Sequence, residues 1–447
     1  MNNQSVYIET LGCAKNRVDS EIMMACMETG GFSPVSDPAR AGVIVLNTCG
    51  FLTSAVNEGL DRFLELAEFK QEGKGHCECL VLAGCMSQRY KDELLDELPE
   101  ADAVLGTSDF TQILTVVEQY LTDQERRGWF NRRPGYEEAN LEAPRILSTL
   151  PHYAWVKIAE GCSNMCSFCS IPALRGGFHS KAIQRVVQEC KGLIGQGVKE
   201  LNLISQDTSS FGIDRDQDLM GLVGELSKLE GDFWVRLFYC YPNRFPLELL
   251  DLMAADPRFV PYLDLPFQHV NDRVLKAMNR KITREKLEKL LEQARTKLPG
   301  VSIRTSLIVG FPGETDRQFE ELLKFVQEGW FDHLGVFAYS DEDNIFSNRL
   351  DDKVPEEVCE ERREAVMLAQ QEVSFAKNQK QVGQIQKVLV EGTSRETDLL
   401  LEGRNARQGV EVDGVVLIND GQATAGTFVE VEITEAHPYD LVGRIVS

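Results

Sequence analysis

The chain has 447 residues, of which 43% are apolar and 26% charged, and it carries a formal net charge of −23 at pH 7. This composition can build the cores of about three domains, and no apolar run approaches the roughly 20 residues that cross a membrane. The first residues show neither the basic nor the apolar region of a signal peptide. We therefore expect a cytoplasmic protein with reduced thiols, whose charge disfavours nucleic-acid phosphates and favours a basic partner.

Residues 1–125 predict an N-terminal parallel α/β domain. Three short apolar runs, at 6–13, 41–49 and 79–85, alternate with helical patterns, and such alternation is typical of a parallel sheet covered on both faces. Each run ends in a cysteine that stands beside a glycine. The cysteines are Cys13, Cys49 and Cys85, spaced by 36 residues, and their glycines are Gly12, Gly50 and Gly84.

Parallel strands bring their carboxyl ends to one edge of a sheet, where ligands bind. The three cysteines therefore predict a three-thiolate iron–sulfur site; the alternative is three buried packing cysteines. Just after Cys13, Asp19 or Ser20 is expected to cap the helix that follows. The local group of His76, Cys77 and Cys79 has no evident further ligand, and we interpret it as structural.

Glycine, proline and charge break the pattern over residues 126–149, which we interpret as a linker. Residues 150–378 then predict six strand–helix units, and hence a partial (β/α)6 barrel of the TIM type with its chemistry at the carboxyl rim. The expected strands are 153–161, 200–207, 234–242, 262–270, 302–314 and 333–340.

The strongest motif lies directly after the first of these strands. Cys162, Cys166 and Cys169 have the spacing C-x3-C-x2-C. Fully ligated iron–sulfur clusters normally take four cysteines, so three thiolates imply a cubane with one iron open for a ligand. A zinc site would need a fourth ligand in a second pair, and the nearest candidate, His179, stands alone.

Polar residues follow other strands of the predicted barrel. Ser205, Gln206 and Asp207 follow the second strand and Gln268 the fourth, while Gly310 and Gly313 form a turn after the fifth. Glycine in such a turn lets a flat ring approach the backbone. His269 is interpreted as an ordinary hydrogen-bonded histidine rather than a catalytic base.

Residues 379–447 lose helical periodicity, and their five short strands predict a small antiparallel, OB-like barrel. From Gln381 onward there are five basic and eleven acidic side chains, a net charge of −6. That surface is unfavourable for phosphate and suits a protein rich in lysine and arginine.

From end to end the chain resembles the radical S-adenosylmethionine (SAM) methylthiotransferases, whose order is a cluster domain, a radical-SAM domain and a terminal TRAM barrel. Within that family it is most similar to the members that modify an aspartate of the twelfth small-subunit ribosomal protein. The segments that carry the resemblance are LGCAKNRVDSE, NTCGF, KIAEGCSNMCSFCSIPALRG, LISQDTSSFG, LPFQH and IVGFPGE.

The resemblance implies two 4Fe–4S clusters and SAM as both methyl donor and radical source. Cys162, Cys166 and Cys169 would hold the cluster that cleaves SAM, and Cys13, Cys49 and Cys85 an auxiliary cluster that carries the transferred sulfur. The SAM pocket would be lined by Phe168, Ser205, Gln206, Asp207, Gln268, Gly310 and Gly313, with no catalytic side chain beyond the cluster ligands.

The implied partners are the basic ribosomal protein, an external electron donor and a sulfur source, with no membrane and no tRNA expected. Two other functions stay open at this point. One is a methylthiotransferase that acts on a tRNA adenosine, which would bind tRNA in a salt-sensitive manner. The other is a non-enzymatic iron–sulfur protein for electron transfer or cluster delivery, which would not bind SAM.

Overall fold

The computed structural model describes residues 4–131 and 143–446, and the chain divides into two compact units. Unit 1 comprises Met1–Ser148, Ala159–Lys181 and Glu342–Ile345. Unit 2 comprises Thr149–Ile158, Ala182–Asp341 and Phe346–Ser447. Part of the expected linker, residues 132–142, lies outside the described residues. No helix of the described chain is long and apolar enough to cross a membrane.

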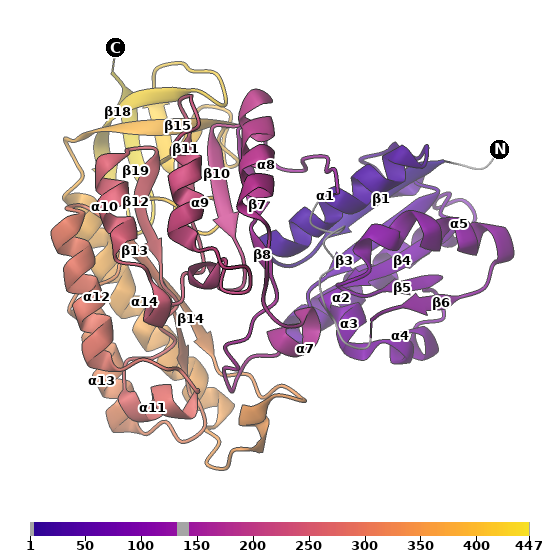
Figure 1. The fold of residues 1–447 in the computed structure, drawn as a ribbon, viewed down its shortest axis with the longest axis horizontal. Coiled ribbons are helices and arrows are strands. Elements are labelled where there is room, and N and C mark those ends of the chain that lie inside the picture. Colours follow the sequence, from indigo (N-terminus) through magenta and orange to yellow (C-terminus); the bar gives the residue numbers. More distant parts are fainter. Residues whose placement is uncertain (1–3, 132–142, 447) are drawn as a thin grey trace. The chain divides into compact units, whose positions relative to one another are not determined.

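Unit 1 is built on a six-stranded parallel sheet in the order β2-β1-β3-β4-β5-β6 (Figure 1). Its strands are β1 Ser5–Thr10, β2 Ser33–Pro34, β3 Val43–Thr48, β4 Cys79–Gly84, β5 Ala103–Leu105 and β6 Arg127–Trp129. Its main helices are α1 Ala14–Thr29, α2 Thr53–Ala67, α3 Cys85–Tyr90, α4 Asp92–Glu97 and α5 Ile113–Asp123, with one-turn helices η1 Pro38–Arg40, η2 Glu68–Lys70 and η3 Phe110–Gln112. The predicted parallel α/β domain is thereby confirmed.

The core of unit 1 explains why the three apolar runs become its central strands. Every residue of β3 and β4 is buried, as expected for parallel strands covered on both faces. Leu46 and Leu82 pack in one cluster with Phe63 of α2 and Met86 of α3. The two- and three-residue strands β2, β5 and β6 are too short to leave a periodic signal, and β6 lies in the segment that we interpreted as a linker.

A second part of unit 1 is the loop between residues 161 and 178. Strands β8 Ala159–Glu160 and β9 His179–Ser180 pair antiparallel and close its base, and it contains the short helix α7 Ile171–Arg175. Gly161 adopts a φ of 73°, and a Cβ there would lie 2.1 Å from the carbonyl oxygen of Gly177. The close approach of these two backbone segments therefore requires glycine at position 161.

Unit 2 contains a second six-stranded parallel sheet, in the order β14-β13-β12-β11-β10-β7. Its strands are β7 Tyr153–Lys157, β10 Glu200–Ile204, β11 Trp234–Leu237, β12 Phe259–Asp264, β13 Ser302–Val309 and β14 His333–Ala338. Its helices are α8 Ile183–Gly195, α9 Leu219–Leu226, α10 Glu248–Ala255, α11 Asp272–Ala277, α12 Arg284–Lys297, α13 Asp316–Gln327 and α14 Glu356–Gln379, with η4 Thr208–Ser210, η5 Pro242–Arg244 and η6 Phe346–Arg349. The sheet is open between β7 and β14, which confirms the partial six-stranded barrel.

The C-terminal barrel of unit 2 is closed, in the order β15-β16-β17-β19-β18. Its strands are β15 Ile385–Thr393, β16 Leu401–Asn405, β17 Val416–Asp420, β18 Phe428–Ala436 and β19 Leu441–Ile445. Val388, Val416, Val431 and Leu441 point into its core. All neighbouring strands are antiparallel except β17 and β19, whose parallel pairing closes the cylinder.

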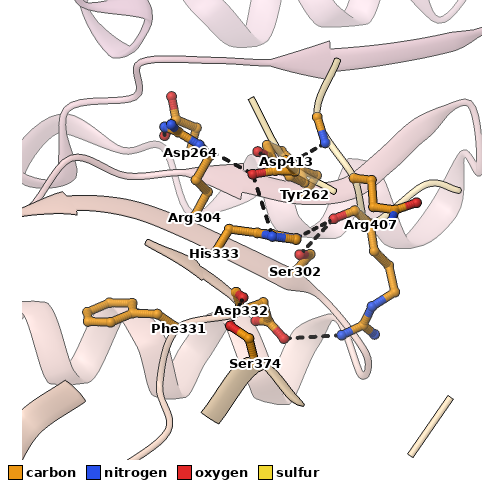
Figure 2. A network of polar contacts seen from close by, with 12 residues as sticks. Tyr262, Asp264, Ser302, Arg304, Phe331, Asp332, His333, Ser374, Arg407 and Asp413 are labelled. Carbon is orange, nitrogen blue, oxygen red and sulfur yellow. Dashed lines mark hydrogen bonds and ion pairs between the residues drawn. The ribbon is translucent and has the colours of Figure 1, made fainter. Parts of the chain in front are cut away.

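A buried polar network joins this barrel to the amino ends of the sheet strands in unit 2. Figure 2 shows Asp413 of the barrel beside Tyr262, whose hydroxyl donates to it at 2.6 Å. His333 lies 2.8 Å from the carbonyl oxygen of Arg407, and the Arg407 guanidinium is 3.1 Å from Asp332. We call these contacts, with those of Glu200, the basal network.

Glu200 is the most enclosed member of the basal network. Its carboxylate, with no exposed surface, accepts from Arg236 at 2.8 Å and from Arg404 of the barrel at 2.5 Å. Burial by itself would raise the pKa of Glu200, but the two guanidinium groups outweigh it and lower that pKa. The carboxylate of Glu200 therefore binds one arginine of the sheet, Arg236, and one arginine of the barrel, Arg404.

Candidate functional site: two cysteine triads in one unit

The first cysteine triad gathers at one edge of the unit 1 sheet. Cys13 occupies the N-cap position of α1, three residues beyond β1, while Cys49 directly follows β3 and Cys85 opens α3 directly after β4. Strands β1, β3 and β4 are neighbours in the sheet. A Cβ added to Gly12 would lie 3.1 Å from the Cβ of Cys49. The structure thus brings together the three residues that the sequence placed at strand ends.

Glycine is required at this edge because the backbone segments nearly touch. A Cβ at Gly50 would lie 2.6 Å from the carbonyl carbon of Cys85. Gly84 adopts a φ of 97°, and a Cβ there would meet the side-chain oxygen of Asn47 at 2.3 Å. A side chain at either position would force the cysteine segments apart.

Asn16 links the segments that carry Cys13 and Cys49. The thiol of Cys13 donates to Asn16 Oδ1 at 3.3 Å, and Asn16 Nδ2 donates to the carbonyl oxygen of Thr48 at 3.0 Å. Our expectation that Asp19 or Ser20 caps this helix is wrong, because α1 already begins at Ala14. Both side chains lie within the helix and are buried.

Arg175, which the sequence analysis did not single out, enters this site from the last turn of α7. Its side chain is 2% exposed. Nη1 donates to Asp19 at 3.0 Å and to Glu160 at 3.1 Å, and Nη2 donates to Asn16 Oδ1 at 3.1 Å. An arginine in the otherwise apolar helix after a cysteine motif was the available signal, but its partner Asn16 lies 159 residues away in the sequence.

The electrostatics of the triad follow from burial and from this arginine. Burial, with the neighbouring Cys85 thiol, raises the pKa of Cys49 to about 11, and burial raises the pKa of Cys85. Arg175 opposes both increases. Although burial disfavours a charged guanidinium, Cys85, Glu160 and Asp19 hold the pKa of Arg175 well above its usual value. Metal binding here must displace thiol protons, and a permanent cation assists that.

The donor set fits an iron–sulfur cluster better than a single ion. Within residues 4–131 and 143–446, no three His, Cys, Asp or Glu side chains converge on one point as a mononuclear site requires. A cubane spreads three thiolates over three irons, so its ligands need not share one centre. Soft thiolates that approach one another at a glycine-lined edge are the ligands that such clusters use.

The second triad lies in the loop of unit 1 closed by β8 and β9. Cys162, Cys166 and Cys169 are all partly exposed. The backbone N–H of Cys169 donates to the carbonyl of Cys166 at 3.1 Å, and that of Cys162 donates to Gly176 at 3.1 Å. These bonds fold eight residues into a compact turn whose three cysteines are each partly exposed. Phe168, expected at the SAM pocket, is half-buried in the same turn.

The other residues expected to line the SAM pocket follow strands of unit 2. Ser205 and Asp207 are buried after β10, where the N–H of Asp207 donates to Ser205 Oγ at 3.1 Å, and Gln206 between them is partly buried. Gln268 has a φ of 72° and pairs with Leu307 of β13. These positions stand at carboxyl ends of parallel strands, as the sequence indicated.

The glycines after β13 differ from each other. A Cβ at Gly310 would lie 2.1 Å from the sulfur of Cys359, so packing of α14 already accounts for glycine there. Gly313, with a φ of 81°, has no atom within 4 Å of such a Cβ. His269 lies 2.9 Å from the buried carboxylate of Glu314, which also accepts from Arg362 at 2.9 Å.

Of the local group at residues 76–79, the two cysteines pack into the unit and His76 is exposed. Cys77 and Cys79 are buried, and the Cys77 thiol donates to the carbonyl oxygen of Cys79 at 3.4 Å. Burial raises the pKa of Cys77 to about 12. A thiol of that kind packs as a small apolar side chain.

Comparison with known proteins assigns the three regions to family models. Residues 5–106 match the uncharacterized protein family UPF0004, residues 156–326 the radical SAM superfamily and residues 382–446 the TRAM domain. The chain is 46% identical to the ribosomal protein uS12 methylthiotransferase RimO of Anaeromyxobacter sp. (strain K), over 99% of this chain and 93% of that protein. It is 44% identical to the RimO of Syntrophotalea carbinolica, over 100% and 98%.

The chain belongs to the RimO family. The family resemblance drawn from its motifs is thereby confirmed. Among solved structures, the radical SAM methyltransferase TsrM from Kitasatospora setae, with cobalamin and a 4Fe–4S cluster bound, has a TM-score of 0.56 and 13% identity over 75% of this chain and 72% of that one. At that identity the likeness shows a shared fold, which this chain combines with a TRAM barrel.

Proposed function

We propose that this protein is a radical SAM methylthiotransferase that acts on ribosomal protein uS12 and adds a methylthio group to the β-carbon of an aspartate. End-to-end identity of 46% to a RimO protein supports this. The observation that carries it is the presence of two cysteine triads within one compact unit. A non-enzymatic electron carrier would not need a second three-thiolate site of this kind beside the SAM motif.

The two triads would divide the chemistry. Cys162, Cys166 and Cys169 would hold the cluster at which SAM is reduced, in a turn that leaves room for an external ligand. Cys13, Cys49 and Cys85 would hold the auxiliary cluster, at an edge that Asn16 ties together. When loaded, these groups and SAM supply the radical that an unactivated carbon requires and the sulfur that replaces its hydrogen.

The residues expected to bind SAM would orient it and exclude water. Ser205 and Asp207 are held by a hydrogen bond at the end of β10, and Gln268 is held in a positive-φ conformation by pairing with β13. Gly313 offers an open approach to backbone. We propose that these residues line the SAM pocket together with Phe168, Gln206 and Gly310. An external electron donor and a sulfur source complete the proposed reaction.

The distribution of charged side chains in the TRAM barrel supports a protein substrate. Arg404 is buried against Glu200 and Glu391, and Arg407 pairs with Asp332. Two of the five basic side chains counted from Gln381 onward therefore form ion pairs within unit 2. Exposed Glu430 and Glu435 stand on β18. Glu391 and Asp413 of the same stretch are buried as well, so the outer surface keeps the acidic balance that composition indicates, which suits a basic protein and repels RNA.

The test offers ribosomal protein uS12 and bulk tRNA side by side to the anaerobically reconstituted enzyme with SAM and reductant. Mass spectrometry should find one methylthio group in place of one hydrogen on a uS12 aspartate and no change on tRNA. Modification of tRNA alone would keep the chemistry but contradict the substrate. SAM cleavage without sulfur on either substrate would contradict the methylthiotransferase itself.

A further inference from the structure

The buried cation Arg175 lies beside the auxiliary triad, and it comes from the segment that carries the other triad. Arg175 stands six residues after Cys169 and ends α7. All of its described partners, Asn16, Asp19 and Glu160, belong to unit 1. The guanidinium is thus bound on one side to the cysteine loop, through Glu160, and on the other side to α1.

One partner of Arg175 also contacts a thiol of the auxiliary triad. Asn16 Oδ1, which accepts from Nη2 at 3.1 Å, also accepts from the Cys13 thiol at 3.3 Å. The guanidinium is therefore separated from the Cys13 sulfur by one shared acceptor atom. A cation this close to cluster ligands stabilises the more negative, reduced state of a cluster, and charge near the sulfurs is an established determinant of its potential.

We propose that Arg175 is the charge partner of the auxiliary cluster, raising its reduction potential, and that it ties the loop of the SAM-cleaving triad to the Cys13 segment through Asn16 and Asp19. The proposal rests on the assignment of an auxiliary cluster in the proposed function. Asp19 acts in the opposite sense, because its carboxylate lies 3.0 Å from Arg175 and its negative charge offsets that of the guanidinium.

The experiment measures the potential of the auxiliary cluster alone. In the full-length chain, Cys162, Cys166 and Cys169 are replaced by alanine so that only the auxiliary cluster is reconstituted. Iron content is determined, and the cluster is titrated by EPR or visible absorption. On this background, Arg175→Gln should shift the midpoint potential to more negative values and Asp19→Asn to more positive values. Arg175→Lys keeps the charge but loses the planar set of guanidinium donors, so its midpoint potential should lie between those of wild type and Arg175→Gln.

Arg145→Gln is the matched control. Arg145 is also a buried arginine of unit 1, and it pairs with Glu21 on the same helix α1 at 3.3 Å. Its removal should leave the midpoint potential unchanged. Loss of buried packing would move both variants of the Arg175–Asp19 pair in the same direction, whereas a charge effect moves them in opposite directions.

The outcomes separate this inference from the proposed function. A triple-alanine background that binds no iron overturns the auxiliary cluster and this inference together. If the triple-alanine protein instead binds a cluster whose midpoint potential neither Arg175→Gln nor Asp19→Asn changes, that result overturns only the role of Arg175. If Arg175→Gln fails to retain iron, Asp19→Asn decides: a positive shift supports the inference, and an unchanged or negative shift overturns it.

Discussion

Each unit contains a buried arginine that binds two carboxylates, but the surroundings of the two arginines differ. In the basal network of unit 2, Arg404 is enclosed by the carboxylates of Glu200 and Glu391 and by a backbone carbonyl. In unit 1, Arg175 meets carboxylates on one side and thiols on the other. The first arrangement is electrically complete and holds two domains together. The second places the guanidinium beside thiols as well as carboxylates, which is the surrounding expected where thiolates bind a metal cluster.

The largest expected effect is on the SAM-cleaving triad. Cys166→Ala should abolish both SAM cleavage and methylthio product, because the turn of residues 162–169 then has two thiols for a cubane that needs three. The assay follows 5′-deoxyadenosine and modified uS12 by chromatography and mass spectrometry. Retention of SAM cleavage at wild-type rate would show that the motif is not the radical site.

The auxiliary triad should fail in a different way. Cys49→Ala should still cleave SAM but attach no sulfur. Cys49 follows β3 at the edge of the unit 1 sheet and does not belong to the turn at 162–169. The same two readouts are measured in parallel with Cys166→Ala. Normal methylthio product from Cys49→Ala would end the division of labour between the triads.

In unit 2, by contrast, a charge substitution should change stability rather than chemistry. Glu200→Ala leaves Arg236 and Arg404 buried without their shared carboxylate, and breaking a buried ion pair in this way costs about 3–5 kcal/mol. Calorimetry should show the loss as a lower Tm. Glu225→Ala is the control, because Glu225 pairs with Lys228 at the surface and should cost about 1 kcal/mol or less.

The smallest expected effect, and the one with opposite sign, concerns Lys377, whose ammonium lies 3.2 Å from Asp332 of the basal network. Burial outweighs the attraction of Asp332 and lowers the pKa of Lys377 to about 8. Asp332 keeps Arg295 and Arg407 as partners, so Lys377→Met should stabilise the protein at pH 7 by about 1–3 kcal/mol.

The pH dependence of that variant follows from proton binding. Between pH 8 and 10.5 the unfolded chain binds more protons at Lys377 than the folded chain, so wild-type stability rises with pH. The advantage of Lys377→Met should therefore shrink over that interval. Thermal unfolding at pH 7 and pH 9.5 measures the difference, and a constant or growing advantage would contradict the lowered pKa.

Much of this architecture is readable from local sequence patterns. The runs that became β3 and β4 are mostly apolar, and β3 is rich in β-branched residues. Each of the six strands expected in residues 150–378 forms a strand of the unit 2 sheet. Strands β2 and β5 left no signal because two or three residues show no period. The start of α1 was misplaced because Asp19 and Ser20 resemble a cap, whereas Cys13 itself takes that position.

The candidate site was only half readable, for a physical reason. The six cysteines are predicted by spacing and by strand ends, which are local properties. The partners of Arg175 are set by tertiary packing between segments 159 residues apart, and no local pattern contains that information. Buried Arg236 could have been suspected, because it interrupts an otherwise apolar strand, whereas Glu200 and Arg404 lie on strands with other polar residues and gave no such signal.

The basal network also has a consequence for how the TRAM barrel can diverge. The arginines that anchor the barrel face inward, toward Glu200 and Asp332, while Glu430 and Glu435 face solvent. Anchoring and recognition thus draw on separate side chains. Replacing the outer acids with lysines would invert the charge presented to a partner and would leave the ion pairs of the basal network intact. A barrel built in this way can therefore change from binding a protein to binding a nucleic acid by surface substitutions alone.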